Sequence, residues 1–180
     1  MPPLFLHSMK IIQPQKAYLP AYLEYCKHSW ATALENYILH DPDLYNQWKD
    51  TIFDDFYKAK NNIDLDEGIV PWIAYWVIEN EKVVAVINFR LYLNEFLKKY
   101  GGSVGILIDP NYRGQGICKK CMPFIFDEYK NLNIKDFMIA TQETNTAAIK
   151  ILDSHNPIKV EKEQVIHDGK PLDIRRYYFD

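Results

Sequence analysis

Apolar residues follow two different periods along the chain, and the changes of period mark the predicted elements. Apolar residues at helical spacing predict one helix from Lys16 to about Tyr37 and a second after the break at His40-Asp-Pro42. Continuous apolar runs bounded by turn residues predict strands instead. These runs lie at residues 72–78, 83–91 and 104–108, and we expect further strands at 9–12, 136–140, 158–166 and 172–179. The order of these elements predicts an α/β fold in which helices pack on a mixed sheet.

Local signals add detail to this outline. The pair Asp168-Gly169 is typical of a tight turn and predicts a hairpin between the last two strands. Pro123 lies inside the helix predicted after residue 116, where it removes a backbone hydrogen bond, so we expect a kink. The second predicted helix carries an apolar stripe that is typical of a core-facing side. The stripe consists of Leu44, Trp48, Ile52, Phe53, Phe56 and Tyr57.

The segment from Val104 to Cys118 holds the main candidate for chemistry. Its first five residues read as a strand buried on both faces, and Asp109-Pro-Asn111 ends that strand in a turn. Gly114 and Gly116 then precede a predicted helix. The first backbone N–H groups of a helix are unpaired and carry partial positive charge, so glycines here let a phosphate approach them. The alternative is that these glycines only tolerate the turn.

Two phosphate-binding motifs are absent from the sequence. There is no G-x-x-x-x-G-K-[ST] pattern, which excludes a P-loop. Lys119 occupies the third glycine position of G-x-G-x-x-G, so a dinucleotide site is not indicated.

The run Arg113-Gly-Gln-Gly116-Ile-Cys118 resembles the acetyl-CoA loop of the GNAT superfamily of N-acetyltransferases. That loop has Gln or Arg, two residues, Gly, one residue, and Gly or Ala; here the last position is Cys. Other segments are similar to a group of bacterial predicted acetyltransferases. They are Gly68-Ile-Val-Pro71, Phe89-Arg90-Leu-Tyr-Leu93-Asn94, Gly101-Gly102 and Arg176-Tyr177-Tyr178.

This resemblance implies a fold, a cofactor and its contacts. The fold is a mixed, mostly antiparallel twisted sheet flanked by helices, and the acyl donor is acetyl-CoA. Its pyrophosphate would lie on the backbone of the glycine run, and its pantetheine arm would pair with the preceding strand like an added strand. Asn145 would contact the same arm, although an Asn at a helix start is also an ordinary cap. The implied cofactor-binding residues are Leu107, Ile108, Arg113, Gly114, Gln115, Gly116, Cys118, Lys119 and Asn145.

The acid and base are less well defined by the resemblance. Many GNAT enzymes protonate the leaving thiolate with a Tyr at the position that Leu152 occupies here. Tyr177 is our candidate acid, with Tyr178 or Ser154 as substitutes. Glu95 and Glu143 are the candidate bases. The alternative is that both carboxylates are solvated and that a water relay carries the proton.

Composition excludes several other classes. The chain has 180 residues, which predicts one domain over residues 1–180, with 1–8 as a candidate leader. The net charge of −3 shows no basic excess, so no nucleic-acid partner is indicated. No apolar run reaches the roughly 18 residues of a membrane span, and the N-terminus lacks a signal-peptide pattern. The three cysteines fit a reduced, cytoplasmic protein, and no metal site is indicated.

Three functions remain open from the sequence. The first is an acetyl-CoA-dependent N-acetyltransferase that modifies a primary amine of a small molecule or peptide, acting as a monomer or homodimer. The alternative is a non-catalytic acyl-CoA-binding module of the same fold, in which Leu152 and Cys118 mark lost chemistry. The third is an unrelated phosphate-binding domain. The sequence does not identify the acceptor.

Overall fold

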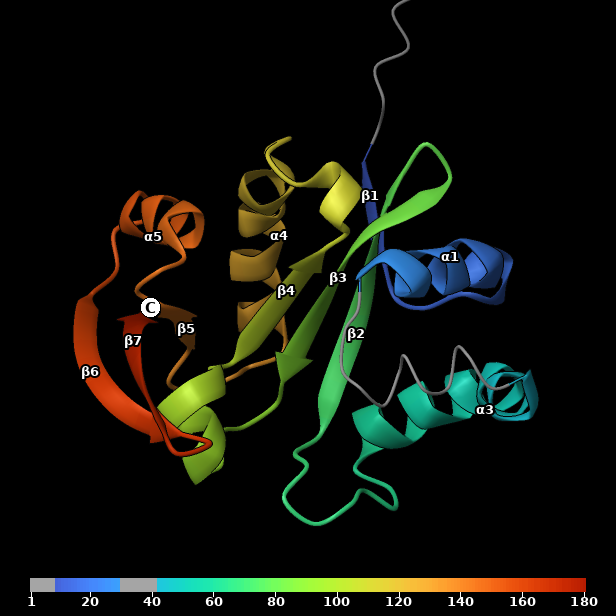
Figure 1. Cartoon of the computed structure of the whole chain (residues 1–180), viewed down its shortest axis with the longest axis horizontal. Coiled ribbons are helices and arrows are strands. Elements are labelled where there is room, and N and C mark those ends of the chain that lie inside the picture. The colour runs from blue at the N-terminus through green and yellow to red at the C-terminus, as the bar shows by residue number, and fades with distance from the viewer. Residues whose placement is uncertain (1–8, 30–41) are drawn as a thin grey trace, which may run out of the picture. The chain divides into compact units, whose positions relative to one another are not determined.

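The computed structural model describes residues 9–29 and 42–180 (Figure 1). Two sequence-based predictions, the leader at residues 1–8 and the helix over residues 30–37, lie outside the described residues. The strands are β1 (Lys10–Ile12), β2 (Trp72–Glu79), β3 (Lys82–Arg90), β4 (Val104–Ile108), β5 (Met138–Gln142), β6 (Lys159–His167) and β7 (Lys170–Tyr178). The helices are α1 (Leu19–Ser29), α3 (Pro42–Asn61), α4 (Ile117–Asn131) and α5 (Thr146–Asp153).

The described chain divides into two compact units. The first comprises the described residues up to Ile63, together with Ile73–Asn88 and Ile106–Ile117. The second comprises Asp64–Trp72, Phe89–Gly105 and Cys118–Asp180. One domain over the whole chain stays a prediction.

An aromatic core holds α1 and α3 against the strands of the first unit. Trp76 on β2 is fully buried, because the ring of Tyr22 from α1 stacks on it at 4.4 Å. Phe53 and Phe56 from α3 meet the same indole edge-on, with ring centroids 6.3 and 6.0 Å away. Such contacts add to the free energy that burial of these large rings contributes. The strands form a sheet in the order β1-β2-β3-β4, with β1 antiparallel to β2.

The apolar stripe predicted on the second helix is confirmed in part. Ile52 is 2% exposed and Phe53 and Phe56 pack on the core. Tyr57 is 60% exposed, so its assignment to the core face was wrong. At about 100° per residue, Ile52, Phe53 and Phe56 share one side of the helix, and Tyr57 lies roughly 140° from Ile52, beyond the edge of that side.

The second unit contains a three-stranded antiparallel sheet in the order β5-β7-β6. Asp168 and Gly169 join β6 to β7 with φ angles of 48° and 73°, which confirms the predicted tight turn. Tyr129 of α4 stacks on Phe137 with ring centroids 4.0 Å apart. α4 continues as one helix through Pro123.

Within this unit, the backbone just before β4 contacts β5 at Gly102. Gly102 forms an isolated antiparallel bridge with Ile139, and the next N–H, of Ser103, donates to the Met138 carbonyl at 2.6 Å. A Cβ on Gly102 would lie 2.7 Å from the Met138 carbonyl oxygen, and the residue has a φ of 71°. Only glycine fits this close approach of two backbones without a shift.

Among the described residues, no helix is long and apolar enough to cross a membrane. The same residues contain no group of three or more His, Cys, Asp or Glu side chains that could hold a metal ion.

Candidate active site

The turn after β4 is fixed by its first residue. The Oδ1 atom of Asp109 accepts a hydrogen bond from the N–H of Asn111 at 2.8 Å, and Pro110 begins one turn of 3-10 helix. The N–H of Asp109 donates to the Val84 carbonyl at 2.9 Å. Asp109 is 3% exposed, so its side-chain and backbone hydrogen bonds are both buried within the first unit. This turn directs the chain into residues 113–116, which we call the glycine loop.

The glycine loop presents bare backbone just before α4. Gly114 and Gly116 both have a φ of 76°, and an added Cβ on either would meet no atom within 4 Å. The two positions therefore need glycine for their backbone conformation and not for lack of space. α4 begins at Ile117, so its first unpaired N–H groups follow directly. This is the backbone that a phosphate-binding loop requires.

The side chains of the glycine loop bond to neighbouring backbone and leave that surface open. Arg113 donates from Nε to the Ile108 carbonyl at 3.4 Å. Gln115 donates from Nε2 to the Asn111 carbonyl at 3.1 Å. Both side chains are exposed. Binding of a pyrophosphate here stays a prediction.

The first turn of α4 carries Cys118 and Lys119. Burial raises the pKa of the Cys118 thiol, which keeps this side chain uncharged. Burial also raises the pKa of Cys121 to about 12, so neither cysteine has the character of a reactive thiolate. Lys119 is exposed. A neutral thiol and an ammonium are both compatible with a bound phosphate.

β4 differs from the strand that the sequence predicts. Of its five residues only Val104 is buried, whereas the expectation was burial on both faces. β4 ends the strand order of its sheet, so fewer neighbours cover it than cover β2 and β3. The Leu107 carbonyl accepts a hydrogen bond from the Tyr25 hydroxyl at 3.1 Å. Pairing of Leu107 and Ile108 with a pantetheine arm stays a prediction.

Asn145 is the N-cap of α5. Its Oδ1 accepts the N–H of Ala148 at 3.2 Å, and the side chain is exposed. The cap that the sequence left open as an alternative is therefore present. A pantetheine contact by the same side chain stays a prediction.

Tyr177 lies within a polar network between β7 and α5. Its side chain is fully buried, and its hydroxyl donates to Asp153 Oδ1 at 2.9 Å. The Tyr177 hydroxyl oxygen in turn accepts a hydrogen bond from Arg175 Nη1 at 3.3 Å. Burial raises the pKa of this phenol. The hydroxyl is therefore neutral, and a neutral phenol is the form that can give up a proton.

Glu143 belongs to the same network. Its two carboxylate oxygens accept from Arg175 Nε at 2.8 Å and Nη2 at 2.6 Å, a bidentate pair. This bonding lowers the pKa of Glu143 below its usual value. The network thus joins two of the predicted residues, Tyr177 and Glu143, through Arg175. A carboxylate of lowered pKa is a weaker base than a free one.

We expect Glu143→Gln to flatten the acid limb of the stability curve. The folded pKa of Glu143 lies below the unfolded value of about 4.3, so its contribution is complete above that pH and is lost as pH falls. Urea midpoints measured between acid and neutral pH check this. Glu67→Gln, in an exposed loop, is the matched control and should follow the wild-type curve. Parallel acid limbs for wild type and Glu143→Gln would contradict the assignment.

The other candidates lie elsewhere in the second unit. The Glu95 side chain is 91% exposed and pairs with Lys98 at 2.8 Å, apart from the Arg175 network. The Tyr178 hydroxyl donates to Glu161 at 2.7 Å. Leu152 is 4% exposed and packs as a core residue of α5. The roles of Glu95, Glu143 and Tyr177 in catalysis stay predictions.

The first unit contains a cavity that the sequence did not predict. This cavity measures about 680 Å³ and is bounded by α1, the β2–β3 turn and the turn after β4. His28 Nδ1 lies 3.3 Å from Asp109 Oδ2, and His28 Nε2 lies 3.4 Å from Glu24 Oε1. Tyr25, Glu81 and Lys82 also line the cavity. His28 and Asp109 are 81 positions apart in the chain, so no local pattern could have paired them.

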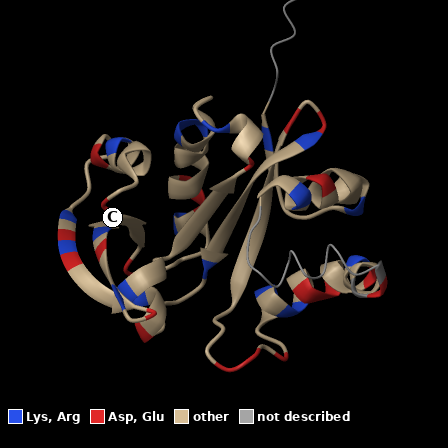
Figure 2. Ribbon diagram, in the orientation of Figure 1, with Lys and Arg blue, Asp and Glu red and all other residues tan. Residues whose placement is uncertain are grey.

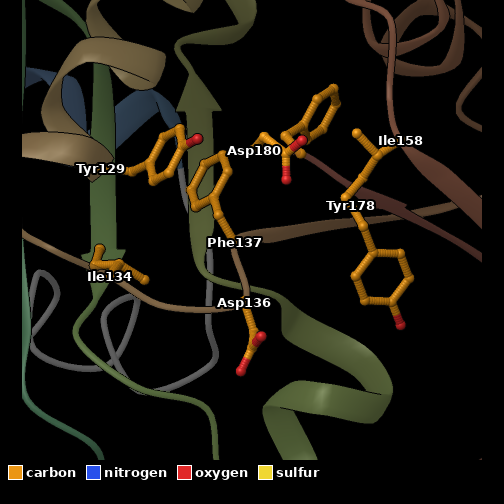
Figure 3. Close-up of a pocket in the computed structure, with 8 residues that line it drawn as sticks. Tyr129, Ile134, Asp136, Phe137, Ile158, Tyr178 and Asp180 are labelled. Atoms are coloured by element: carbon orange, nitrogen blue, oxygen red, sulfur yellow. The ribbon is translucent and has the colours of Figure 1, made fainter.

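A second cavity of about 260 Å³ lies in the second unit, and half of the residues that line it are aromatic (Figure 3). Tyr129 and Phe137 form one wall, while the polar ends of Asp136 and Tyr178 point away from that ring pair. The Tyr129 hydroxyl is buried without a hydrogen-bond partner among the described residues. Of the residues predicted for the site, the substitute acid Tyr178 lines this cavity, whereas Tyr177, Glu95 and Glu143 do not.

Residues 33–155 match the family model of the acetyltransferase (GNAT) family, which covers more than half of the chain. No curated protein matches the chain in a sequence comparison.

Solved structures with similar folds bear related names. One is a ribosomal L7/L12 alpha-N-protein acetyltransferase in complex with coenzyme A, with a TM-score of 0.64 and 14% identity over 98% of this chain and 96% of that one. A ribosomal-protein-S5-alanine acetyltransferase from Vibrio fischeri also has a TM-score of 0.64, with 15% identity over 97% and 93%. An N-acetyltransferase from Staphylococcus aureus Mu50 has a TM-score of 0.59, with 17% identity over 96% and 98%. At these identities the likeness concerns the fold, and it confirms the predicted α/β architecture with antiparallel sheets flanked by helices.

Proposed function

The chain belongs to the acetyltransferase (GNAT) family, and we propose that it transfers an acetyl group from acetyl-CoA to a primary amine of a small molecule or peptide. Acetyl-CoA is the acyl donor of this family. The observation that carries the proposal is the glycine loop, where Gly114 and Gly116 leave open backbone directly before α4.

In the proposed reaction the amine attacks the thioester carbonyl carbon directly. The C–N bond forms, the C–S bond breaks, and the coenzyme A thiolate leaves. An N–H group of β4, at Leu107 or Ile108, stabilises the oxyanion. Tyr177 supplies the proton that the thiolate takes up. Glu95, Glu143 or a water relay accepts the proton that the amine loses.

The ionisation of the network supports this division of roles. Tyr177 has a raised pKa, so it holds its proton at neutral pH, and Arg175 at 3.3 Å stabilises any phenolate that forms. Glu143 is held as a carboxylate by the same Arg175. Much of the remaining rate acceleration comes from holding acetyl-CoA and the amine in place. In this proposal β4 and the glycine loop position the acetyl-CoA.

Calorimetric binding of acetyl-CoA tests the proposal. We expect Gly116→Trp to weaken acetyl-CoA binding at least about tenfold. The indole would fill the space over the backbone at this position, so the backbone N–H groups could no longer contact the phosphates. Gly68→Trp is the matched control, since Gly68 also has positive φ (84°) and open space but lies outside the glycine loop. It should bind like wild type.

Two results would contradict the proposal. Wild-type protein that does not bind acetyl-CoA under reducing conditions would remove the cofactor site. Wild-type protein that binds acetyl-CoA but acetylates no amine would favour the alternative, a non-catalytic acyl-CoA-binding module.

A further inference from the structure

The cavity of the first unit has the size and the lining of a small-molecule site. Its volume of about 680 Å³ falls within the usual range for ligand pockets, and its walls combine tyrosine rings with carboxylates. From this lining we propose that it binds the second positive charge of the acceptor, so that the preferred acceptor is a small aliphatic diamine or polyamine. This inference rests on the proposed acetyl transfer.

The charges that line the cavity favour a cation. Glu24, Glu81 and Asp109 contribute three negative charges and Lys82 one positive charge, which leaves −2 before His28 is counted. Figure 2 shows the acidic and basic positions on α1 and on the β2–β3 turn. An organic ammonium ion is attracted to such a field and can also contact an aromatic face. Tyr25 and Tyr112 provide aromatic side chains in the lining.

Neighbouring lysines reduce this field only in part. Lys27 lies 2.9 Å from Glu24, and Lys10 lies 3.8 Å from Glu81. Both pairs are more than half exposed, and exposed pairs contribute little and exchange readily. The Asp109 side chain is only 4% exposed, and its Oδ2 lies 3.3 Å from His28 Nδ1. A cationic ligand can therefore displace a lysine from Glu24 or Glu81 while Asp109 stays in place.

The cavity adjoins the strand along which acetyl-CoA is expected to lie. Tyr25 lines the cavity, and its hydroxyl donates to the Leu107 carbonyl at 3.1 Å. Asp109, another wall residue, directly follows Ile108. Leu107 and Asp109 are two residues apart, which is roughly 7 Å along a strand. An aliphatic diamine can thus place one nitrogen in the cavity and the other beside the end of β4.

Calorimetry with 1,5-diaminopentane and pentylamine, which differ by one amino group, tests the cavity without any turnover. We expect wild type to bind the diamine about tenfold more tightly than the monoamine, and kcat/KM for acetylation to show the same preference. The double variant Glu24→Gln/Glu81→Gln should lose most of the preference. Glu67→Gln, which removes an exposed carboxylate outside the cavity lining, is the control and should keep it.

The outcomes separate this inference from the proposed function. Equal affinities for the two amines, or a preference that survives the double substitution, would overturn the cavity assignment and leave acetyl transfer untouched. Selective diamine binding with equal kcat/KM for both amines would overturn its role in acceptor choice. Failure to bind acetyl-CoA would instead remove the proposed function, while the calorimetric preference still reports on the cavity.

Discussion

Gly102→Ala is expected to destabilise the protein by about 3 kcal/mol, from steric overlap and from an alanine forced into the left-handed region. The new Cβ would lie 2.7 Å from the Met138 carbonyl oxygen and 2.9 Å from the Ala140 nitrogen. Both are backbone atoms of the β5 region and cannot rotate away. The Gly102 N–H also donates to the Leu97 carbonyl at 2.7 Å, which ties the preceding turn of π-helix (Leu97–Gly101) to the same point. Urea unfolding followed by circular dichroism measures the loss.

Gly68→Ala separates the two causes. Gly68 has a φ of 84°, as demanding as that of Gly102, but an added Cβ there meets nothing within 4 Å. This variant should lose only the conformational part, about 1 kcal/mol. A loss of equal size in both variants would show that the backbone contact between Gly102 and Met138 is looser than its distances indicate.

The elements of the fold were predictable where local chemistry determines them. Asp168 and Gly169 adopt positive φ angles that few other residue pairs tolerate, so the last hairpin follows from two adjacent residues. The apolar runs of β2 and β3 likewise mark strands that are buried. β4 looked the same in sequence, but its place at the end of the sheet order leaves it half-buried. Strand order depends on contacts between residues far apart in the sequence, so it cannot be predicted from a short apolar run.

The candidate site likewise has features that the sequence predicts and features that it does not. The glycine loop was predictable, because its backbone conformation restricts the residue type locally. The pairing of Arg175 with Glu143 and the bond from Tyr177 to Asp153 join residues 32 and 24 positions apart. The contact between His28 and Asp109 in the wall of the larger cavity joins residues 81 positions apart. Such contacts depend on how elements pack, so only the structure reveals them.

Tyr177→Phe is expected to lower kcat for acetyl transfer about 100-fold with little change in acetyl-CoA affinity, as loss of a general acid predicts. The substitution removes one oxygen from a fully buried ring and keeps its packing on the neighbouring Phe179, whose centroid lies 6.5 Å away. The substitution therefore removes only the two hydrogen bonds that the Tyr177 hydroxyl makes with Asp153 and Arg175. Steady-state kinetics with a fixed amine and varied acetyl-CoA separate kcat from affinity.

Tyr178→Phe is the matched control, because it removes the same atom from the next residue of β7. Its hydroxyl bonds to Glu161 at 2.7 Å and takes no part in the Arg175 network, so kcat should change less than about twofold. The reverse order of effects would transfer the acid role to Tyr178. Tyr177 is fully buried in the free chain. This burial is compatible with the acid role, because the hydrogen bonds of catalytic groups often tighten only once substrate is bound. If neither substitution slows transfer, the thiolate takes its proton from water, and the Tyr177 network serves only to hold α5 against β7.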